Sequence, residues 1–111
     1  MKYVLLICDD ESTSPSNEEI EADPVHQRWL ADLAGRGTRL YGARLRPIAD
    51  VTSVRVRDGE TLVSDGPYAE TKDFVGGIVV IECANLDDAI AIAAGHPYAQ
   101  WGGVEIRPMW E

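Results

Sequence analysis

The chain has 111 residues, 45% of them hydrophobic, which is typical of one globular domain spanning residues 1–111. Its net charge of -9 argues against direct nucleic-acid binding, because a phosphate backbone is bound by clustered Lys and Arg side chains. The apolar run at residues 3–8 ends at Asp9 and is too short for a membrane or secretory segment, so we expect a cytoplasmic protein without a membrane partner.

The first half of the chain predicts a strand, a helix and a second strand. Residues 2–8 are rich in β-branched and aromatic side chains, which is typical of a strand. Asp23 before Pro24 is typical of a helix start, and apolar residues then recur at helical spacing until Gly35 and Gly37 end the helix. Residues 38–46 predict the second strand.

A β-hairpin is predicted in the middle of the chain. Residues 54–57 and 61–64 read as strands on either side of Asp58 and Gly59. This dipeptide fits a two-residue type I′ turn, because both of its positions take positive φ angles. We therefore expect the two strands to pair directly across the turn.

The last third predicts another strand, a helix and a final strand. Residues 77–83 are almost continuously apolar, and Asn85 is placed to cap a helix that stops at Gly95. The final strand is expected at residues 104–110, with Trp110 on its inward face together with the apolar residues before it.

These elements predict an α+β fold of the ferredoxin-like, split βαβ type with a hairpin insertion. Residues 3–8 and 78–81 are apolar at successive positions, so both faces of these strands should be buried. Two helices can cover one face only. We expect a second copy of the chain to cover the other face in a homodimer, with the loop at residues 9–23 as an alternative cover.

The turn at residues 65–72 reads Asp-Gly-Pro-Tyr-Ala-Glu-Thr-Lys and precedes a Gly-Gly pair and a strand. Together with residues 86–89 and 103–108, it resembles the YCII-related family, in the branch named for an Asp-Gly-Pro-Phe motif, with Tyr68 in place of the phenylalanine. The resemblance implies a dimeric α/β barrel of largely unassigned role. Some members are encoded beside, or fused to, extracytoplasmic-function sigma factors, which implies a possible functional link to a sigma factor.

The resemblance also implies a catalytic pair, because a His and Asp dyad has been proposed in smaller relatives. His26 in the first helix is the candidate histidine, and Asp65 is assigned by motif position. A neutral imidazole near a helix N-terminus is available as a base near neutral pH. The open alternatives are a packed His26 and an Asp65 that accepts backbone N–H groups of its own turn.

Four further residues are candidates for ligand binding. Arg44 and Arg46 fall on one face of the second predicted strand, where paired guanidinium groups suit a carboxylate or phosphate, although they could equally neutralise the acidic loop. Tyr68 offers a phenolic donor. His96 follows the stop of the second helix, where the alternative is that it caps the last carbonyl groups.

No cofactor or metal is predicted. The two histidines lie far apart, Cys8 and Cys83 have no metal-ligand spacing, and both cysteines are expected to be buried and reduced. No dinucleotide or phosphate-loop pattern is present. We therefore expect a homodimer whose cleft binds a small anionic or carbonyl-bearing molecule, with cofactor-free acid–base chemistry as a possible activity. The alternative is a non-catalytic accessory or regulatory domain linked to sigma-factor transcription.

Overall fold

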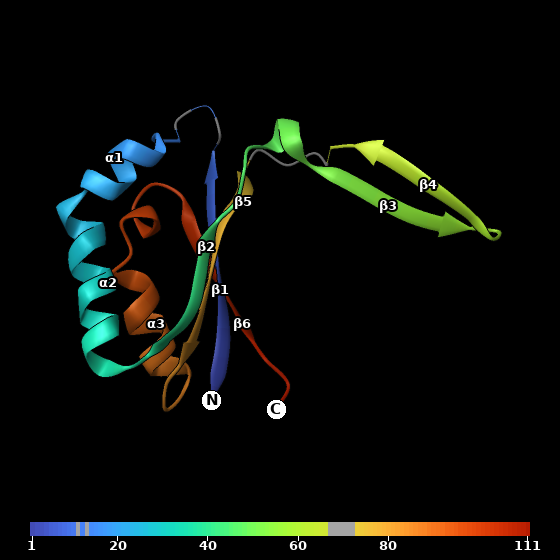
Figure 1. The fold of residues 1–111 in the computed structure, drawn as a ribbon. Helices are drawn as coiled ribbons and strands as arrows, with labels where there is room; N and C mark the ends of the chain where they lie inside the picture. The colour runs from blue at the N-terminus through green and yellow to red at the C-terminus, as the bar shows by residue number, and fades with distance from the viewer. Residues whose placement is uncertain (11, 13, 67–72) are drawn as a thin grey trace.

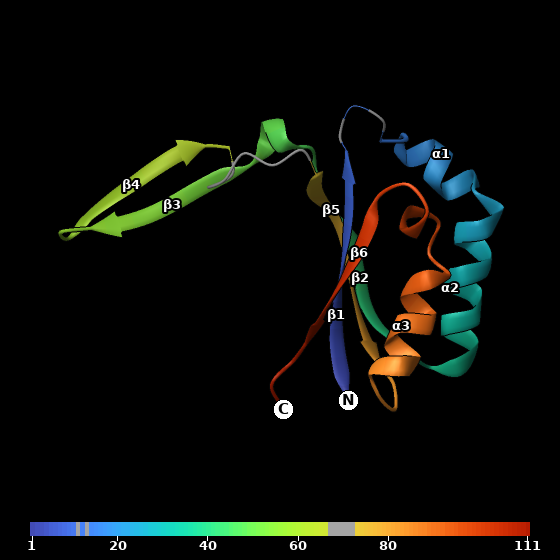
Figure 2. The same ribbon diagram turned by 180° about the vertical axis from the view of Figure 1, so that it is seen from behind.

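A computed structural model describes residues 1–10, 12, 14–66 and 73–111. Its main sheet is antiparallel in the order β2-β5-β1-β6. These strands are β1 (Lys2–Asp10), β2 (Arg39–Arg44), β5 (Asp73–Glu82) and β6 (Gly103–Pro108). Three α-helices lie on one face of the sheet (Figures 1 and 2), namely α1 (Asn17–Ala22), α2 (Pro24–Arg36) and α3 (Leu86–Ala94). This arrangement is consistent with the predicted ferredoxin-like α+β fold.

The helix boundaries follow from local capping. Ser16 and Glu19 form a capping box at the start of α1. The Asp23 carboxylate accepts a hydrogen bond from the Val25 amide at 2.8 Å, so α2 begins at Pro24 as predicted. Gly37 ends α2 with a left-handed φ of 63°. These caps fix where α2 starts, and therefore where its first turn meets the sheet.

The two faces of β1 have different surroundings. Its odd-numbered residues from Tyr3 to Asp9 are buried beneath the helices, and Leu5 is 0% exposed. The even-numbered residues, including Val4 and Leu6, point to the opposite face and are partly exposed in the single chain. The helices therefore cover one apolar face, and the proposed barrel dimer, which would cover the other, stays a prediction.

The hairpin of β3 (Thr52–Arg57) and β4 (Glu60–Asp65) forms a separate two-stranded sheet. Asp58 and Gly59 have φ angles of 52° and 76°, which confirms the turn, and Arg57 pairs with Glu60 across it. The hairpin projects away from the helices and main sheet in both ribbon views (Figures 1 and 2). We call this projecting hairpin the arm. The short helix η2 (Ile48–Asp50) precedes it.

The structure corrects several boundaries and placements. β2 ends at Arg44, so Arg46 lies beyond the strand rather than within it. Trp110 is fully exposed, with a relative accessibility of 102%, instead of pointing inward. β6 pairs with β1, which begins at Lys2. The Lys2 carbonyl accepts from the Met109 amide at 3.0 Å, so β1 has no further strand residue against which Trp110 could pair. The side chains of Cys8 and Cys83 are of intermediate exposure, not buried as expected.

Candidate functional site

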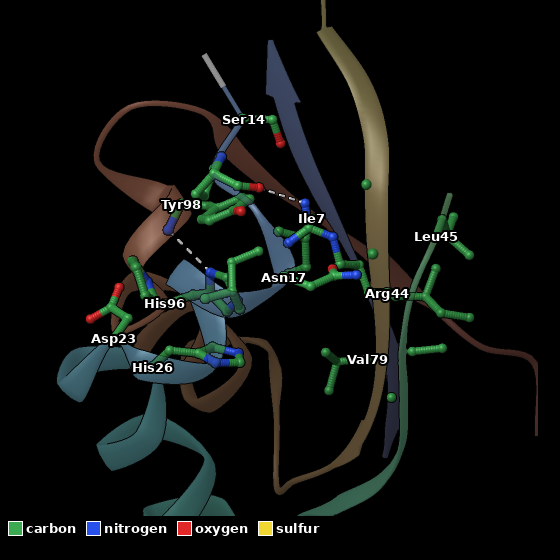
Figure 3. A pocket seen from close by; sticks show the side chains of 18 of the residues that line it. Ile7, Ser14, Asn17, Asp23, His26, Arg44, Leu45, Val79, His96 and Tyr98 are labelled. Atoms are coloured by element: carbon green, nitrogen blue, oxygen red, sulfur yellow. Dashed lines mark hydrogen bonds between the residues drawn. The ribbon is translucent and has the colours of Figure 1, made fainter. Parts of the chain in front are cut away.

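A cleft of about 1040 Å³ lies between the helices and the helix-side face of the sheet. Its walls come from α1, the first turns of α2, β2, β5 and the segment around the short helix η3 (Pro97–Ala99). In Figure 3, His26, His96 and Tyr98 lie on the helix side, and Arg44 and Val79 on the strand side. This volume is sufficient for a small organic molecule.

The helix-side wall is set by α2 and its contact with α3. The Trp29 indole N–H donates to the Ile92 carbonyl at 2.7 Å, a buried bond that ties α2 to α3. His26 lies one turn earlier, stacked near Trp29 with ring centroids 6.3 Å apart. The cap at Asp23 and this anchor at Trp29 together hold the His26 ring at the cleft wall.

His26 and His96 form an imidazole pair, with ring centroids 5.4 Å apart and planes nearly perpendicular. His96 is buried and precedes η3, where its Nδ1 accepts from the Tyr98 amide at 3.1 Å. A neutral His96 therefore carries its proton on Nε2. It caps the start of η3, not the end of α3, which differs from the capping alternative considered for this residue.

Both imidazoles are held in the neutral form. Burial, reinforced by the neighbouring His26, lowers the pKa of His96 from 6.5 to about 4, with Asp23 opposing the shift. Burial likewise lowers the pKa of His26, with Arg39 adding to the effect and Asp23 opposing it. The pair can therefore accept or donate hydrogen bonds at neutral pH.

Three arginines line the strand side of the cleft. Arg46 pairs with Asp50 at 3.0 Å. The Arg44 guanidinium donates to the Pro15 carbonyl at 2.8 Å, and neither Arg44 nor Arg39 forms an ion pair with any described residue. Arg39 lies over Gly42, where any added Cβ would collide with its guanidinium. Among the described residues that line the cleft, Arg39 and Arg44 are thus the cations whose charge is available for an anion.

The structure brings together four of the six predicted site residues: His26, Arg44, Arg46 and His96 all line the cleft. Asp65 does not line it, because it ends β4 on the exposed arm. Tyr68 lies outside the described residues. The predicted pairing of His26 with Asp65 is therefore not formed in this chain, while the imidazole pair of His26 and His96 is.

Sequence reasoning did not single out three residues of this region. Arg39 pairs with Ile81, whose side chain is buried beneath the helices, and the irregularity between Arg39 and Tyr41 brings it to the same face as Arg44, which simple alternation does not predict. Tyr98 follows Pro97 in a short segment with no periodic pattern, so no local signal marks it. Asp9 was counted only as a charge ending the first strand, yet the alternation of Tyr3, Leu5 and Ile7 continues to Asp9 and buries it. Continuing the two-residue period would have found Asp9.

No described helix is long and apolar enough to span a bilayer. No group of three or more His, Cys, Asp or Glu side chains among residues 1–10, 12, 14–66 and 73–111 is arranged to hold a metal ion.

Comparison with known proteins identifies the family of this chain and a relative. The family model described as the YCII-related domain matches residues 1–111. The chain is also 35% identical over 120 residues to the uncharacterized protein R00369 of Rhizobium meliloti (strain 1021), covering 98% of this chain and 92% of that protein. Both matches span almost the whole chain, so they include every residue of the cleft described above.

Proposed function

The chain belongs to the YCII-related family, and from its cleft we propose that it binds a small anionic or carbonyl-bearing molecule and acts on it by cofactor-free acid–base chemistry. The observation that carries the proposal is the imidazole pair of His26 and His96 on one wall of a cleft whose other wall presents Arg39 and Arg44. A base facing cations suits a substrate that becomes more negative as it loses a proton.

The arginine wall defines the ligand's charged end. Guanidinium groups bind carboxylate and phosphate oxygens in a planar, often bidentate geometry. The Arg44 guanidinium donates to an uncharged acceptor, the Pro15 carbonyl, and an anionic ligand oxygen can replace that acceptor with a bond between two opposite charges. We therefore assign the anionic group of the ligand to Arg39 and Arg44.

The imidazole pair defines the chemistry. His26 in its neutral form takes a proton from a carbon next to a carbonyl group: the C–H bond breaks, an N–H bond forms, and the electron pair moves onto the carbonyl oxygen. The positive charge of Arg44 and a donated His96 Nε2–H stabilise that oxygen. His96, with its pKa near 4, remains a neutral donor throughout.

A homodimer is part of the same proposal. The face of the main sheet opposite the helices is apolar at Val4, Leu6 and Val80, and Tyr41 on its edge is 58% exposed. We call this surface the open face. The arm also exposes apolar side chains, with Val56 57% and Val63 65% accessible. Exposed apolar surfaces of this kind, on one chain, favour burial against a second copy.

The test begins with ligand binding. A thermal-shift screen of carboxylates, phosphates and 2-oxo acids should raise the melting temperature for ligands of the proposed class. Arg44→Ala should weaken binding of the best ligand about tenfold or more, the loss expected for one charge-assisted hydrogen bond. Arg28→Ala removes the same charge from an exposed position of α2 outside the cleft and should leave binding unchanged.

Turnover is followed in D₂O by proton NMR with the best-binding 2-oxo acid. The protein should accelerate the exchange of the proton on the carbon next to the carbonyl, seen as loss of its signal. In His26→Ala this acceleration should be absent. Full exchange in His26→Ala removes this residue from the mechanism. Equal weakening of binding by Arg44→Ala and Arg28→Ala contradicts the arginine assignment.

A further inference from the structure

A row of aromatic rings borders the cleft and ends in a half-exposed tryptophan. The ring centroids are 4.8 Å apart for Trp29 and His96, and 5.3 Å apart for His96 and Tyr98. The last two rings, those of Tyr98 and Trp101, lie closest together, with centroids 4.4 Å apart. All four residues line the cleft, and none of the roles assigned above uses Trp101.

Trp101 is held in place by its neighbours in the chain. The Tyr98 ring packed against it is buried, and the Gly102 amide that follows it donates to the Tyr98 carbonyl at 2.8 Å. A Cβ at Gly102 would collide with the Cys8 carbonyl oxygen, so this turn lies directly against the end of β1. Trp101 nevertheless keeps 49% of its surface accessible. A positioned indole ring therefore offers apolar surface to a ligand.

The surroundings of Trp101 differ from those of the other exposed tryptophan. Trp110 is fully exposed and does not line the cleft, and a single exposed apolar side chain of this kind needs no functional explanation. Trp101 borders the same cleft as Arg44 and His26. An aromatic side chain in one cleft with a cation and a base suits an anion that also has an apolar body.

The strand side of the cleft leaves room for such a body. At Gly42 the space above the strand holds the Arg39 guanidinium. At Gly77 no side chain fills the cleft, and the nearest atoms to an added Cβ would be the Ala43 carbonyl oxygen at 3.3 Å and Ile7 Cβ at 3.7 Å. The volume of about 1040 Å³ suits a drug-sized ligand, whereas a small aliphatic acid would fill little of it.

We propose that Trp101 binds an aromatic ring, so that the ligand of this cleft is an aromatic anion: a carboxylate or 2-oxo acid that carries a planar ring. The inference rests on the proposed function and narrows its ligand class. Arg39 and Arg44 bind the anionic group, and the ring of the ligand packs against the Trp101 indole.

Two contributions favour a ligand of this class. Burial of apolar surface stabilises the complex in proportion to the area removed from water, for a saturated group as well as for an aromatic one. Contact between two aromatic rings adds about a two- to tenfold gain in affinity beyond this area effect, because the edge of a ring is positive and its face negative. The first contribution distinguishes large anions from small ones, and the second distinguishes aromatic anions from saturated ones.

The test uses three carboxylates with the same anionic group: propionate, 3-phenylpropionate and 3-cyclohexylpropionate. Isothermal titration with the intact protein should show 3-phenylpropionate binding about tenfold or more tightly than propionate, because a phenyl group is buried. The cyclohexyl compound is at least as apolar, so burial alone would favour it. It should nevertheless bind about twofold or more weakly than the phenyl compound, because it makes no contact between aromatic rings.

Variants of the two exposed tryptophans locate the ring contact. Trp101→Leu keeps an apolar side chain and should remove the preference for phenyl over cyclohexyl, while the affinity for propionate stays unchanged. Trp101→Phe restores a ring and should restore the preference. Trp110→Leu makes the same change outside the cleft and should leave all three affinities unchanged.

The outcomes separate this inference from the function it rests on. Equal affinity for the phenyl and cyclohexyl compounds, or a phenyl preference that persists in Trp101→Leu, overturns the aromatic subsite and leaves anion binding by Arg39 and Arg44 standing. Weaker binding of propionate in Trp101→Leu also overturns it, because Trp101 would then affect the whole cleft and not the ring alone. If none of the three carboxylates and no anion of the thermal-shift screen binds, both proposals are wrong.

Discussion

The two faces of β1 are equally apolar in sequence but differ in what covers them. Leu5 points toward the helices and is completely buried, whereas its neighbour Leu6 points to the open face and is partly exposed. The helices, the cleft and both imidazoles all lie on the Leu5 side. The comparison teaches that an apolar strand predicts burial on both faces, while the described chain covers only one of them.

The largest effect is expected on the covered face. Leu5→Ala should lower the free energy of unfolding by about 2–5 kcal/mol, because it removes buried methyl groups and leaves a cavity in the core. The measurement is urea denaturation monitored by tryptophan fluorescence. Leu6→Ala is the matched control, and in dilute protein it should cost about 1 kcal/mol or less. Equal losses would show that both faces are already covered within one chain.

The pH dependence of stability should also come from the covered face. The pKa of His96 is about 4 in the folded chain and 6.5 in the unfolded reference, so the unfolded state takes up the proton first. The free energy of unfolding should therefore be highest above pH 6.5 and should decrease, by at most about 3 kcal/mol, as the pH falls toward 4. Burial of His26 acts in the same direction.

His96→Asn tests this effect, because asparagine keeps an acceptor for the Tyr98 amide but does not titrate. The variant should be less sensitive to pH between 6.5 and 4 than the unchanged protein, as measured by urea denaturation at each pH. Glu105→Gln is the control on the open face, where the exposed pair with Arg107 should contribute less than about 1 kcal/mol. If Glu105→Gln changes the pH dependence of stability more than His96→Asn does, the assignment of that dependence to His96 is wrong.

The smallest effect on the unfolding of a single chain is expected from Leu6→Lys, because Leu6 is only partly buried there. The same change should abolish the proposed dimer, since it places a charge at the centre of the open face. Sedimentation velocity should give a dimer for the unchanged protein and a monomer for Leu6→Lys. Val25→Lys adds the same charge at an exposed position of α2 and should remain dimeric.

Hydrogen exchange tests whether the arm is part of the proposed dimer interface. If the second copy covers the arm, the amides of β3 and β4 should exchange more slowly in the dimer than in Leu6→Lys. Equal exchange in a confirmed dimer would leave the arm outside the interface. A monomeric unchanged protein at micromolar concentration would contradict the dimer itself.

The candidate site was predictable in part. Capping at Asp23 and helical spacing placed His26 at the start of α2, whereas strand alternation predicted only that Arg44 and Arg46 share a face, and the structure shows that Arg44 lies on the helix-side face. The predicted partner Asp65 came from its position in a motif, and no local pattern indicated that the arm would carry it away from the cleft. His96 became the partner of His26 because α2 and η3 pack together, which sequence spacing does not encode.

The sequence by itself determined the elements, their order and the turn at Asp58 and Gly59, because capping, periodicity and positive φ angles depend on neighbouring residues. Only the tertiary structure decided that His26 meets His96 and that the arm stands apart from the main sheet. Those contacts join segments far apart in the chain. They depend on how the elements pack, and no local pattern carries that information.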